Sequence, residues 1–382
     1  MNDDVYKKSL EIHRKYRGKL ETVSKIKLDS KEILSLTYSP GVAGVSKEIA
    51  RDPSLAREYT LKRNTVAIVS DGSAILGLGN LGPLAAIPVM EGKAAIFKEF
   101  SGINAFPICL DTQDVEEIIK AVHQIAPVFG GINLEDIAGP KCFEIESRLR
   151  KELPIPVMHD DQWGAATVIL AGLINSLKLA GRNKSDVKVV ISGIGAAGVA
   201  TARLLLIYGI TNILYVDSKG IVHHDSMGIT HEKEELLNGS TAIPQAGTLA
   251  DAIVGAHIFI GLSKPGIVTQ DMVRTMTEKP IIFALANPTP EILPDEAIAA
   301  GAYIVATGRS DFPNQMNNSL VFPGAFKGML EANISQFTVE MFSGIAQALA
   351  DAVDDLSPQK ILPTMFDEGV VDIVSQTIQK YK

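Results

Sequence analysis

Two pairs of adjacent acids, Glu135-Asp136 and Asp160-Asp161, each follow a short apolar segment that we predict to be a strand. Acids just past strand ends are typical of a hard-cation site in an α/β protein, because carboxylate oxygens are ligands that suit Mg²⁺ and Mn²⁺. Three of these carboxylates could hold one ion and leave positions open for a substrate. On this pattern alone, acids in solvated loops are the simpler explanation.

A glycine-rich segment, Gly193-Ile-Gly-Ala-Ala-Gly198, has the spacing of a dinucleotide-binding turn. The apolar run Val187 to Ser192 precedes it, as expected for a strand buried on both faces of a parallel sheet, and an apolar helix follows. We expect Gly193 to make the tight turn, Gly195 to admit the pyrophosphate, and Gly198 to let helix and strand pack closely.

The residues around this turn predict how the cofactor is held. Ala196 and Ala197 begin the helix, whose N-terminus faces the phosphate charge. The next strand ends at Asp217, 24 residues past Gly193, where a carboxylate can accept a hydrogen bond from a ribose 2′-hydroxyl. Asp217 therefore favours NAD over NADP, although Lys219 could offset its charge.

A second match to the glycine spacing, Gly77 to Gly82, fits the motif less well. The strand before it is interrupted by Ser70-Asp-Gly-Ser, and Pro83 follows it at once. We interpret it as a backbone turn near the substrate, not as a second nucleotide site.

The elements that carry these motifs indicate an α/β protein. From residue 163 on, strand-like and helical segments alternate, which predicts a doubly wound, Rossmann-type parallel sheet. We predict an N-terminal α/β substrate and metal domain at 1–162, an NAD(P)-binding domain at 163–330 and a C-terminal helical segment at 331–382. In the N-terminal domain the expected strands are 65–69, 94–97, 106–110, 130–134 and 156–159, and the expected helices are 83–90, 114–126 and 140–151. A long apolar helix is expected at 164–179.

The bulk composition restricts the possible partners. The chain has 382 residues and a net charge of −8, which argues against a general affinity for nucleic acid or for anionic membranes. No signal peptide or membrane-spanning segment is expected. Cys109 and Cys142 are the only cysteines, too few for a disulfide framework, so a reducing cytoplasm is the expected location.

The chain as a whole resembles the short, bacterial-type malic enzymes. The resemblance extends in order over residues 5–330. It is carried by seven segments: Leu36-Thr-Tyr-Ser-Pro-Gly-Val-Ala, Ser70-Asp-Gly-Ser-Ala-Ile-Leu-Gly-Leu-Gly-Asn-Leu-Gly-Pro, Pro88-Val-Met-Glu-Gly-Lys-Ala, Ile132-Asn-Leu-Glu-Asp-Ile, His159-Asp-Asp-Gln, Ala284-Leu-Ala-Asn-Pro-Thr-Pro-Glu and Asn314-Gln-Met-Asn-Asn-Ser.

This resemblance implies a reaction and a set of proton-transfer residues. The reaction would be oxidative decarboxylation of L-malate to pyruvate and CO₂ with reduction of NAD(P)⁺, with oxaloacetate as a further substrate. Lys93 would be the general base for the C2 hydroxyl. That role needs a depressed pKa, which a nearby divalent cation can supply. Asp160 would tune Lys93, and Tyr38 would protonate C3 of the enolate.

The resemblance also implies the ligands of metal and substrate. Glu135, Asp136 and Asp161 would hold Mg²⁺ or Mn²⁺. Asn287 and Asn318 would hold a substrate carboxylate and the nicotinamide ribose by neutral hydrogen bonds. A homodimer is implied, and we predict that Tyr38 lies close to the subunit boundary or across it, because the N-terminal segment that carries it is too small to fold alone.

Two residues depart from what such enzymes carry. Trp163, the only tryptophan, replaces a polar residue after His159-Asp-Asp-Gln, next to the expected metal and cofactor region. Ala74 stands where larger relatives have a substrate-binding arginine, so another cation must hold the β-carboxylate. Two rival functions stay open: a malolactic enzyme that retains NADH and releases lactate, and a non-catalytic regulatory homologue.

Overall fold

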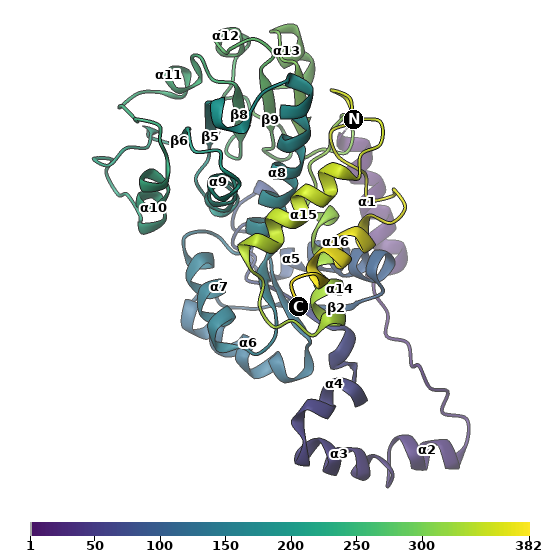
Figure 1. Cartoon of the computed structure of the whole chain (residues 1–382). Coiled ribbons are helices and arrows are strands. Elements are labelled where there is room, and N and C mark those ends of the chain that lie inside the picture. The colour runs from purple at the N-terminus through teal and green to yellow at the C-terminus, as the bar shows by residue number, and fades with distance from the viewer. Residues whose placement is uncertain (1) are drawn as a thin grey trace.

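A computed structural model of the whole chain describes residues 2–382, apart from the solvent exposure of residues 2, 3 and 77. It contains two sheets, one wholly parallel and the other parallel except for one edge strand (Figure 1). The smaller sheet has four strands in the order β2-β1-β3-β4, all parallel. Its strands are β1 (Thr65–Ser70), β2 (Asn104–Cys109), β3 (Gly131–Leu134) and β4 (Val157–His159).

Helices cover the smaller sheet because each has an apolar side to bury. In α6, the carboxylate of Asp114 accepts a hydrogen bond from the Glu117 N–H as the N-terminal cap, and Ile118, Ile119 and Val122 are buried at helical spacing. The helices of this part are α5 (Pro83–Ile96), α6 (Val115–Ile125) and α7 (Lys141–Glu152).

The larger sheet has six strands in the order β10-β9-β8-β5-β6-β7, with only β7 antiparallel. This is the doubly wound α/β arrangement that the sequence predicted. Its strands are β5 (Val189–Ser192), β6 (Ile213–Asp217), β7 (Gly220–Ile221), β8 (Ile258–Gly261), β9 (Ile281–Ala284) and β10 (Ile304–Thr307). Its helices are α9 (Ala196–Tyr208), α10 (His231–Gly239), α11 (Leu249–Ile253), α12 (Gln270–Arg274) and α13 (Pro294–Ala299).

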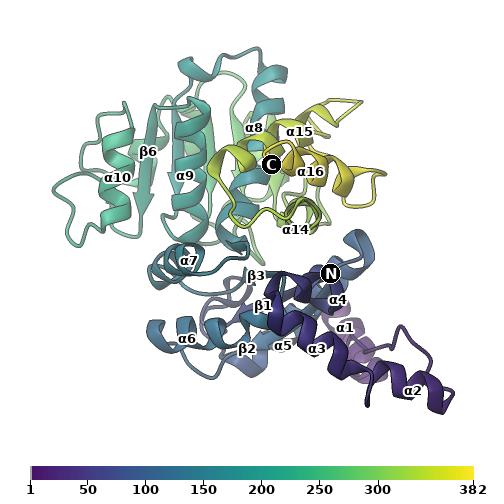
Figure 2. The ribbon, with the colours of Figure 1, turned by 60° about the horizontal axis from the view of Figure 1, so that its bottom comes forward.

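The helix α8 (Asp160–Ala180) connects the two sheets and packs against α9 and α15. It is long and apolar enough to span a membrane by composition alone, but 78% of its apolar window is buried inside the protein. It is therefore a core helix of this fold. The C-terminal helices lie beside the larger sheet (Figure 2), and they are α14 (Phe322–Ala332), α15 (Val339–Asp351) and α16 (Val370–Gln379).

Most expected elements are present, and two differ. Residues 94–96 are the last turn of α5 and not a strand, and residues 97–101 continue as a π-helical turn. The helix expected at 164–179 begins at Asp160, so Asp160 and Asp161 occupy its first turn. The boundary that we predicted after residue 162 consequently falls within α8, and the division into domains stays a prediction.

The N-terminal segment leaves the body of the protein (Figure 1). Helix α1 (Asn2–Tyr16) is followed by Lys19, whose ammonium donates to the Pro88 carbonyl of α5 at 2.7 Å. The chain then extends to α2 (Lys31–Thr37) and α3 (Val42–Arg51), neither of which contains a buried residue. A short helix, α4 (Ala56–Tyr59), leads back to β1.

Candidate active site

A cleft of about 600 Å³ lies between the two sheets, at the carboxyl ends of strands from both. This is where ligands bind in open α/β sheets. The segment just before the second glycine match, Gly77 to Gly82, borders the cleft through Ala74 and Leu76. Seven of the predicted site residues line the cleft: Lys93, Glu135, Asp136, Asp161, Ala197, Asn287 and Asn318.

The cationic centre of the cleft is Lys93, near the end of α5. Its Nζ is 2.8 Å from Glu135 Oε1, donates to Asp160 Oδ2, and lies 4.1 Å from the centre of the Phe322 ring. Burial disfavours the charged ammonium, but the charges of Asp160 and Glu135 outweigh it, so the pKa of Lys93 is raised above its ordinary value. Among the described residues that line the cleft, Lys93 is the only lysine or arginine.

The carboxylates around Lys93 outnumber it. Burial is the main cause that raises the pKa of Glu135 and of Asp160, although Lys93 opposes it in both. Burial and the charge of Asp161 raise the pKa of Asp136 to about 7. Four buried or half-buried acids therefore face one lysine, and their negative charge is only partly compensated.

The backbone at Asp136 is held in a strained conformation. Its φ of 53° lies in the left-handed region, which an aspartate seldom adopts. The Asp136 N–H donates to Asp161 Oδ2 at 2.8 Å, and the Asp136 carbonyl accepts from the Ala74 N–H at 3.0 Å. These contacts join the loop after β3 to the first turn of α8 and to the loop after β1.

The carboxylate oxygens of this cluster are suitable ligands for a divalent cation. Asp136 Oδ2 is buried and has no hydrogen-bond partner, and it borders the cleft in a set of uncompensated carboxylates. Among the described residues, no three His, Cys, Asp or Glu side chains already converge on one position where an ion could sit. Coordination by Glu135, Asp136 and Asp161 would thus require side-chain rotations.

The dinucleotide turn has the backbone that the sequence predicted. Gly193 has a φ of 100°, and a side chain there would lie 2.4 Å from the Leu262 carbonyl oxygen. A Cβ on Gly198 would lie 1.9 Å from the Gly193 oxygen, which explains why strand and helix require glycine at their contact. At Gly195 nothing lies within 4 Å of an added Cβ, so this side of the turn is open to a ligand.

A second pocket extends from this turn to Asp217. Asp217 accepts from the Lys219 N–H at 2.8 Å and is paired with Lys233 Nζ at 2.6 Å. Partial burial disfavours its charge, but these hydrogen bonds hold the pKa of Asp217 below its ordinary value. The Lys219 ammonium donates to the Met227 carbonyl at 2.9 Å, so Lys233 and not the Lys219 side chain is the main countercharge.

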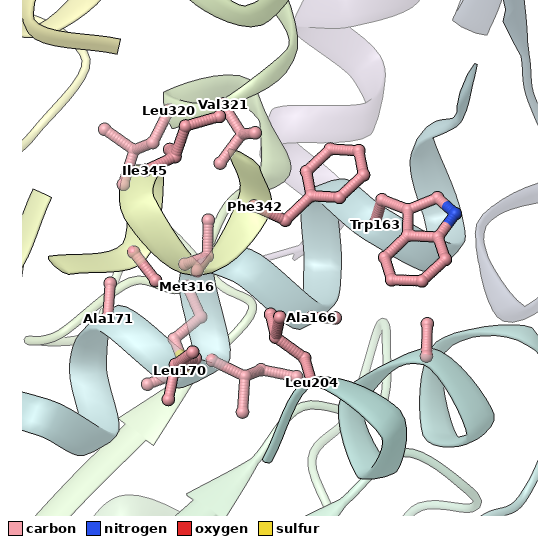
Figure 3. Packing of buried hydrophobic residues seen from close by; sticks show 14 of the residues in the cluster. Trp163, Ala166, Leu170, Ala171, Leu204, Met316, Leu320, Val321, Phe342 and Ile345 are labelled. Atoms are coloured by element: carbon pink, nitrogen blue, oxygen red, sulfur yellow. The ribbon is translucent and has the colours of Figure 1, made fainter. Parts of the chain in front are cut away.

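Trp163 does not line the cleft. It stacks on Phe342 of α15 with ring centroids 4.9 Å apart and planes 6° from parallel (Figure 3). Its Nε1 donates to Glu146 Oε2 at 3.1 Å. The expectation that this tryptophan would lie next to the metal and the cofactor is therefore wrong for its side chain, which is part of the core between α8 and α15.

Tyr38 also lies apart from the cleft. It follows α2 on the extended N-terminal segment, and 69% of it is exposed. The structure of one chain therefore brings together Lys93, Asp160 and the predicted metal ligands, but not Tyr38.

Sequence reasoning missed several residues that shape these pockets. Lys233 lies 16 residues after Asp217 and carries no motif that would have identified it. The buried Glu291 ends a motif that we noticed but to which we gave no role. Ser263 lines both the cleft and the second pocket, and only the fold shows this.

The chain combines a Rossmann-type nucleotide turn with a buried lysine and a cluster of acids beside it. This combination, on two sheets, is that of an NAD(P)-dependent oxidoreductase. Two family models match the chain: "Malic enzyme, N-terminal domain" over residues 17–150 and "Malic enzyme, NAD binding domain" over residues 163–378. The chain belongs to the malic enzyme family.

Similar proteins agree with this assignment. The chain is 52% identical to the NAD-dependent malic enzyme of Geobacillus stearothermophilus over 94% of this chain and 76% of that protein. It is 49% identical to the bifunctional malic/malolactic enzyme of Bacillus subtilis over 97% and 92% of the two chains. A crystal structure of the NAD-dependent malic enzyme from Thermotoga maritima superimposes with a TM-score of 0.94 at 47% identity, covering 97% of this chain and 98% of that one.

The two glycines of the turn give a matched test of the dinucleotide site. Gly198→Ala should lower the free energy of unfolding by about 1–3 kcal/mol, because its Cβ meets the Gly193 oxygen. Gly195→Ala should leave stability nearly unchanged but weaken NADH binding, because its Cβ enters the open side of the turn. Thermal unfolding and NADH fluorescence titration measure the two effects. Unchanged NADH affinity in Gly195→Ala would contradict this placement of the cofactor.

Proposed function

We propose that this protein catalyses the oxidative decarboxylation of L-malate to pyruvate and CO₂, with NAD⁺ as the preferred hydride acceptor and NADP⁺ as a second one. The observation that carries the proposal is the ion pair between Lys93 and Glu135 at 2.8 Å, in a cleft that the dinucleotide turn borders through Ala197. A proton-transfer group, an acidic cluster and a nucleotide turn are the parts that this reaction needs.

Lys93 is proposed to take the C2 hydroxyl proton as the hydride leaves for the nicotinamide. As it lies, its ammonium is stabilised by Asp160 and Glu135, and this opposes the role of a base. Glu135, Asp136 and Asp161 would hold Mg²⁺ or Mn²⁺, which when bound supplies positive charge that polarises the C2 oxygen and stabilises the enolate. Carboxylates that hold the cation would stabilise the Lys93 ammonium less. Asp160 would remain the partner that orients Lys93.

Asn287, in the loop after β9, and Asn318, in the turn before α14, are proposed to hold a substrate carboxylate and the nicotinamide ribose. Both offer neutral amide donors, which bind a carboxylate without further stabilising the charge on Lys93. Ala74 at the border of the cleft offers no charge. The cation for the β-carboxylate must then come from the metal site, from Lys93 or from a second subunit.

A homodimer is proposed to complete the site with Tyr38. Helices α2 and α3 contain no buried residue, and several of their apolar side chains are exposed, as on a surface that contacts another chain. A second copy that covers them would carry Tyr38 toward a cleft other than its own, where its phenol could protonate C3 of the enolate. The exposed apolar residues of α2 and α3 are Leu34, Leu36, Val42 and Val45.

A malolactic reaction is the second candidate. It is favoured by the 49% identity to the Bacillus subtilis enzyme, which is named as bifunctional. In that reaction NADH would stay bound and reduce pyruvate to lactate. Product analysis separates the two candidates, because only the first releases NADH. Decarboxylation of added oxaloacetate is proposed as a side reaction of the same site.

A cytoplasmic location is proposed because Cys109 and Cys142 are both free thiols. The net charge of −8 favours a small-molecule substrate over nucleic acid or an anionic membrane as the partner.

The reaction should require a divalent cation. Exhaustive chelation should abolish NADH production from L-malate and NAD⁺, and added Mn²⁺ or Mg²⁺ should restore it. Asp136→Asn should raise the Mn²⁺ concentration needed for half-maximal rate by at least about tenfold, since it removes a charged oxygen donor. Full activity after chelation would exclude the metal role.

Lys93 and Tyr38 should each be essential, and mixed subunits should show whether they act across the dimer. General acid–base groups contribute about 10²–10⁴-fold, so Lys93→Ala and Tyr38→Phe should each lose activity in that range. A verified heterodimer of the two variants should recover up to about half of the wild-type rate per dimer, since one of its two sites would contain both groups. A heterodimer without recovery would place both groups on one chain, and a monomer in sedimentation would exclude the dimer.

Lys233 should control the choice between NAD⁺ and NADP⁺. In Lys233→Gln, Asp217 loses its countercharge and should repel a 2′-phosphate more strongly. We expect the KM for NADP⁺ to rise about tenfold and the KM for NAD⁺ to change less than threefold. Lys219→Gln is the matched control, because the Lys219 ammonium donates to the Met227 carbonyl instead. Equal changes for both cofactors would argue against this role of Lys233.

A further inference from the structure

A fully buried carboxylate, Glu291, lies beneath the cofactor side of the cleft without a cation. Its side chain is 0% exposed, and within residues 2–382 the structure shows no lysine, arginine or histidine paired with it. Its partners are backbone N–H groups. The Ser263 N–H donates to Oε1 at 2.9 Å, and the Ala286 N–H donates to Oε2 at 3.0 Å.

The surrounding chain is shaped to admit this carboxylate. Gly261 ends β8, and a Cβ there would lie 2.4 Å from the Glu291 carboxyl carbon. The backbone adds two links: the Val268 N–H donates to the Glu291 carbonyl at 3.0 Å, and the Gly266 N–H donates to the Pro290 carbonyl at 3.1 Å. The loops after β8 and β9 are thus bound to one side chain.

These two loops border the route that a dinucleotide must follow. Ser263 lines both the second pocket, which contains Asp217, and the cleft, which contains Lys93. Its hydroxyl is 3.1 Å from the Ser192 hydroxyl at the end of β5. Ala286 lines the cleft next to Asn287. A shift of either loop would therefore move the surface between the adenosine end and the nicotinamide end of the site.

We propose that Glu291 is a positioning residue for the dinucleotide, which holds the loops after β8 and β9 in their binding arrangement before the cofactor arrives. Its direct targets are the Ser263 and Ala286 N–H groups. The inference rests on the proposed function only in that the nicotinamide end is taken to lie in the cleft beside Lys93.

The chemistry of the site explains why a carboxylate is used. The two N–H donors reach different oxygens of the same side chain, Oε1 and Oε2, and only a carboxylate offers two acceptor oxygens at these positions. Burial raises the pKa of Glu291, and the hydrogen bonds from Ser263 and Ala286 oppose this effect. Glutamine has nearly the same size but only one acceptor oxygen, so it would turn an N–H₂ group toward one of the two backbone donors.

The test compares Glu291→Gln with Glu146→Gln. Glu146 is also buried and also accepts a backbone hydrogen bond, from the His159 N–H at 3.0 Å, but it lies on α7 behind the start of α8. We expect the Kd for NADH, measured by fluorescence without malate or metal, to rise about tenfold in Glu291→Gln and to change less than twofold in Glu146→Gln. In turnover, Glu291→Gln should raise the KM for NAD⁺ and leave the KM for malate within twofold.

Two outcomes would overturn the proposal: an unchanged Kd in Glu291→Gln, or equal increases in both variants, which would indicate only a general loss of rigidity. If Glu291→Gln does not fold, hydrogen exchange in the wild-type protein decides instead. The Ser263 and Ala286 amides should exchange slowly without NAD, and fast exchange would overturn the proposal. Because NADH binding is measured without malate, failure of the proposed reaction would appear separately, as absent turnover in the wild type.

Discussion

The structure depends on one electrostatic constraint: four carboxylates and a single lysine lie together at the junction of two sheets. Coulombic repulsion between buried acids is expensive, and Lys93 alone compensates only part of it. The site can persist because the fold fixes each acid separately. Asp136 is held by the Ala74 and Asp161 contacts, Glu135 Oε2 accepts from the Asn133 amide at 3.0 Å, and Asp160 is held by Lys93. A divalent cation would neutralise the negative charge that Lys93 leaves uncompensated.

The two parallel sheets provide the means of assembling this cluster. Parallel strands end on the same side, so short loops after each strand deliver polar groups to one edge. Here the carboxyl ends of both sheets face the same cleft, the smaller sheet with acids and the larger with the loops that carry Asn287 and Gly308. Helix α8 begins at the acidic edge and continues as a buried element that packs against α9, so the positions of the acidic cluster and of the nucleotide turn are linked through one helix.

Much of this could be predicted from the sequence because the signals were local. The strand, glycine turn and helix from Val187 to Tyr208 follow rules of backbone geometry, and the structure has them as expected. The strand predicted at residues 94–97 was wrong because four apolar residues satisfy a buried helix turn as well as a strand, and the helix already formed from Pro83 continued through them. Trp163 was misplaced for a different reason: its position in the chain was near the acids, but α8 directs it to the opposite side, onto Phe342.

Contacts between distant segments were beyond sequence reasoning, and the buried glutamates show why. Glu146 and Glu291 are each surrounded by donors from other elements, and neither has a spacing that identifies those donors in advance. A carboxylate that accepts several N–H bonds in a dry interior is satisfied without a cation, so it leaves no paired lysine or arginine in the sequence as a signal. Glu146 accepts from groups at the start of α8, and Glu291 accepts from the loops after β8 and β9. Acidic residues of one type therefore differ in their surroundings: Glu135 and Asp160 are paired with Lys93, whereas Glu291 accepts from backbone N–H groups, depending only on which donors the fold places around each.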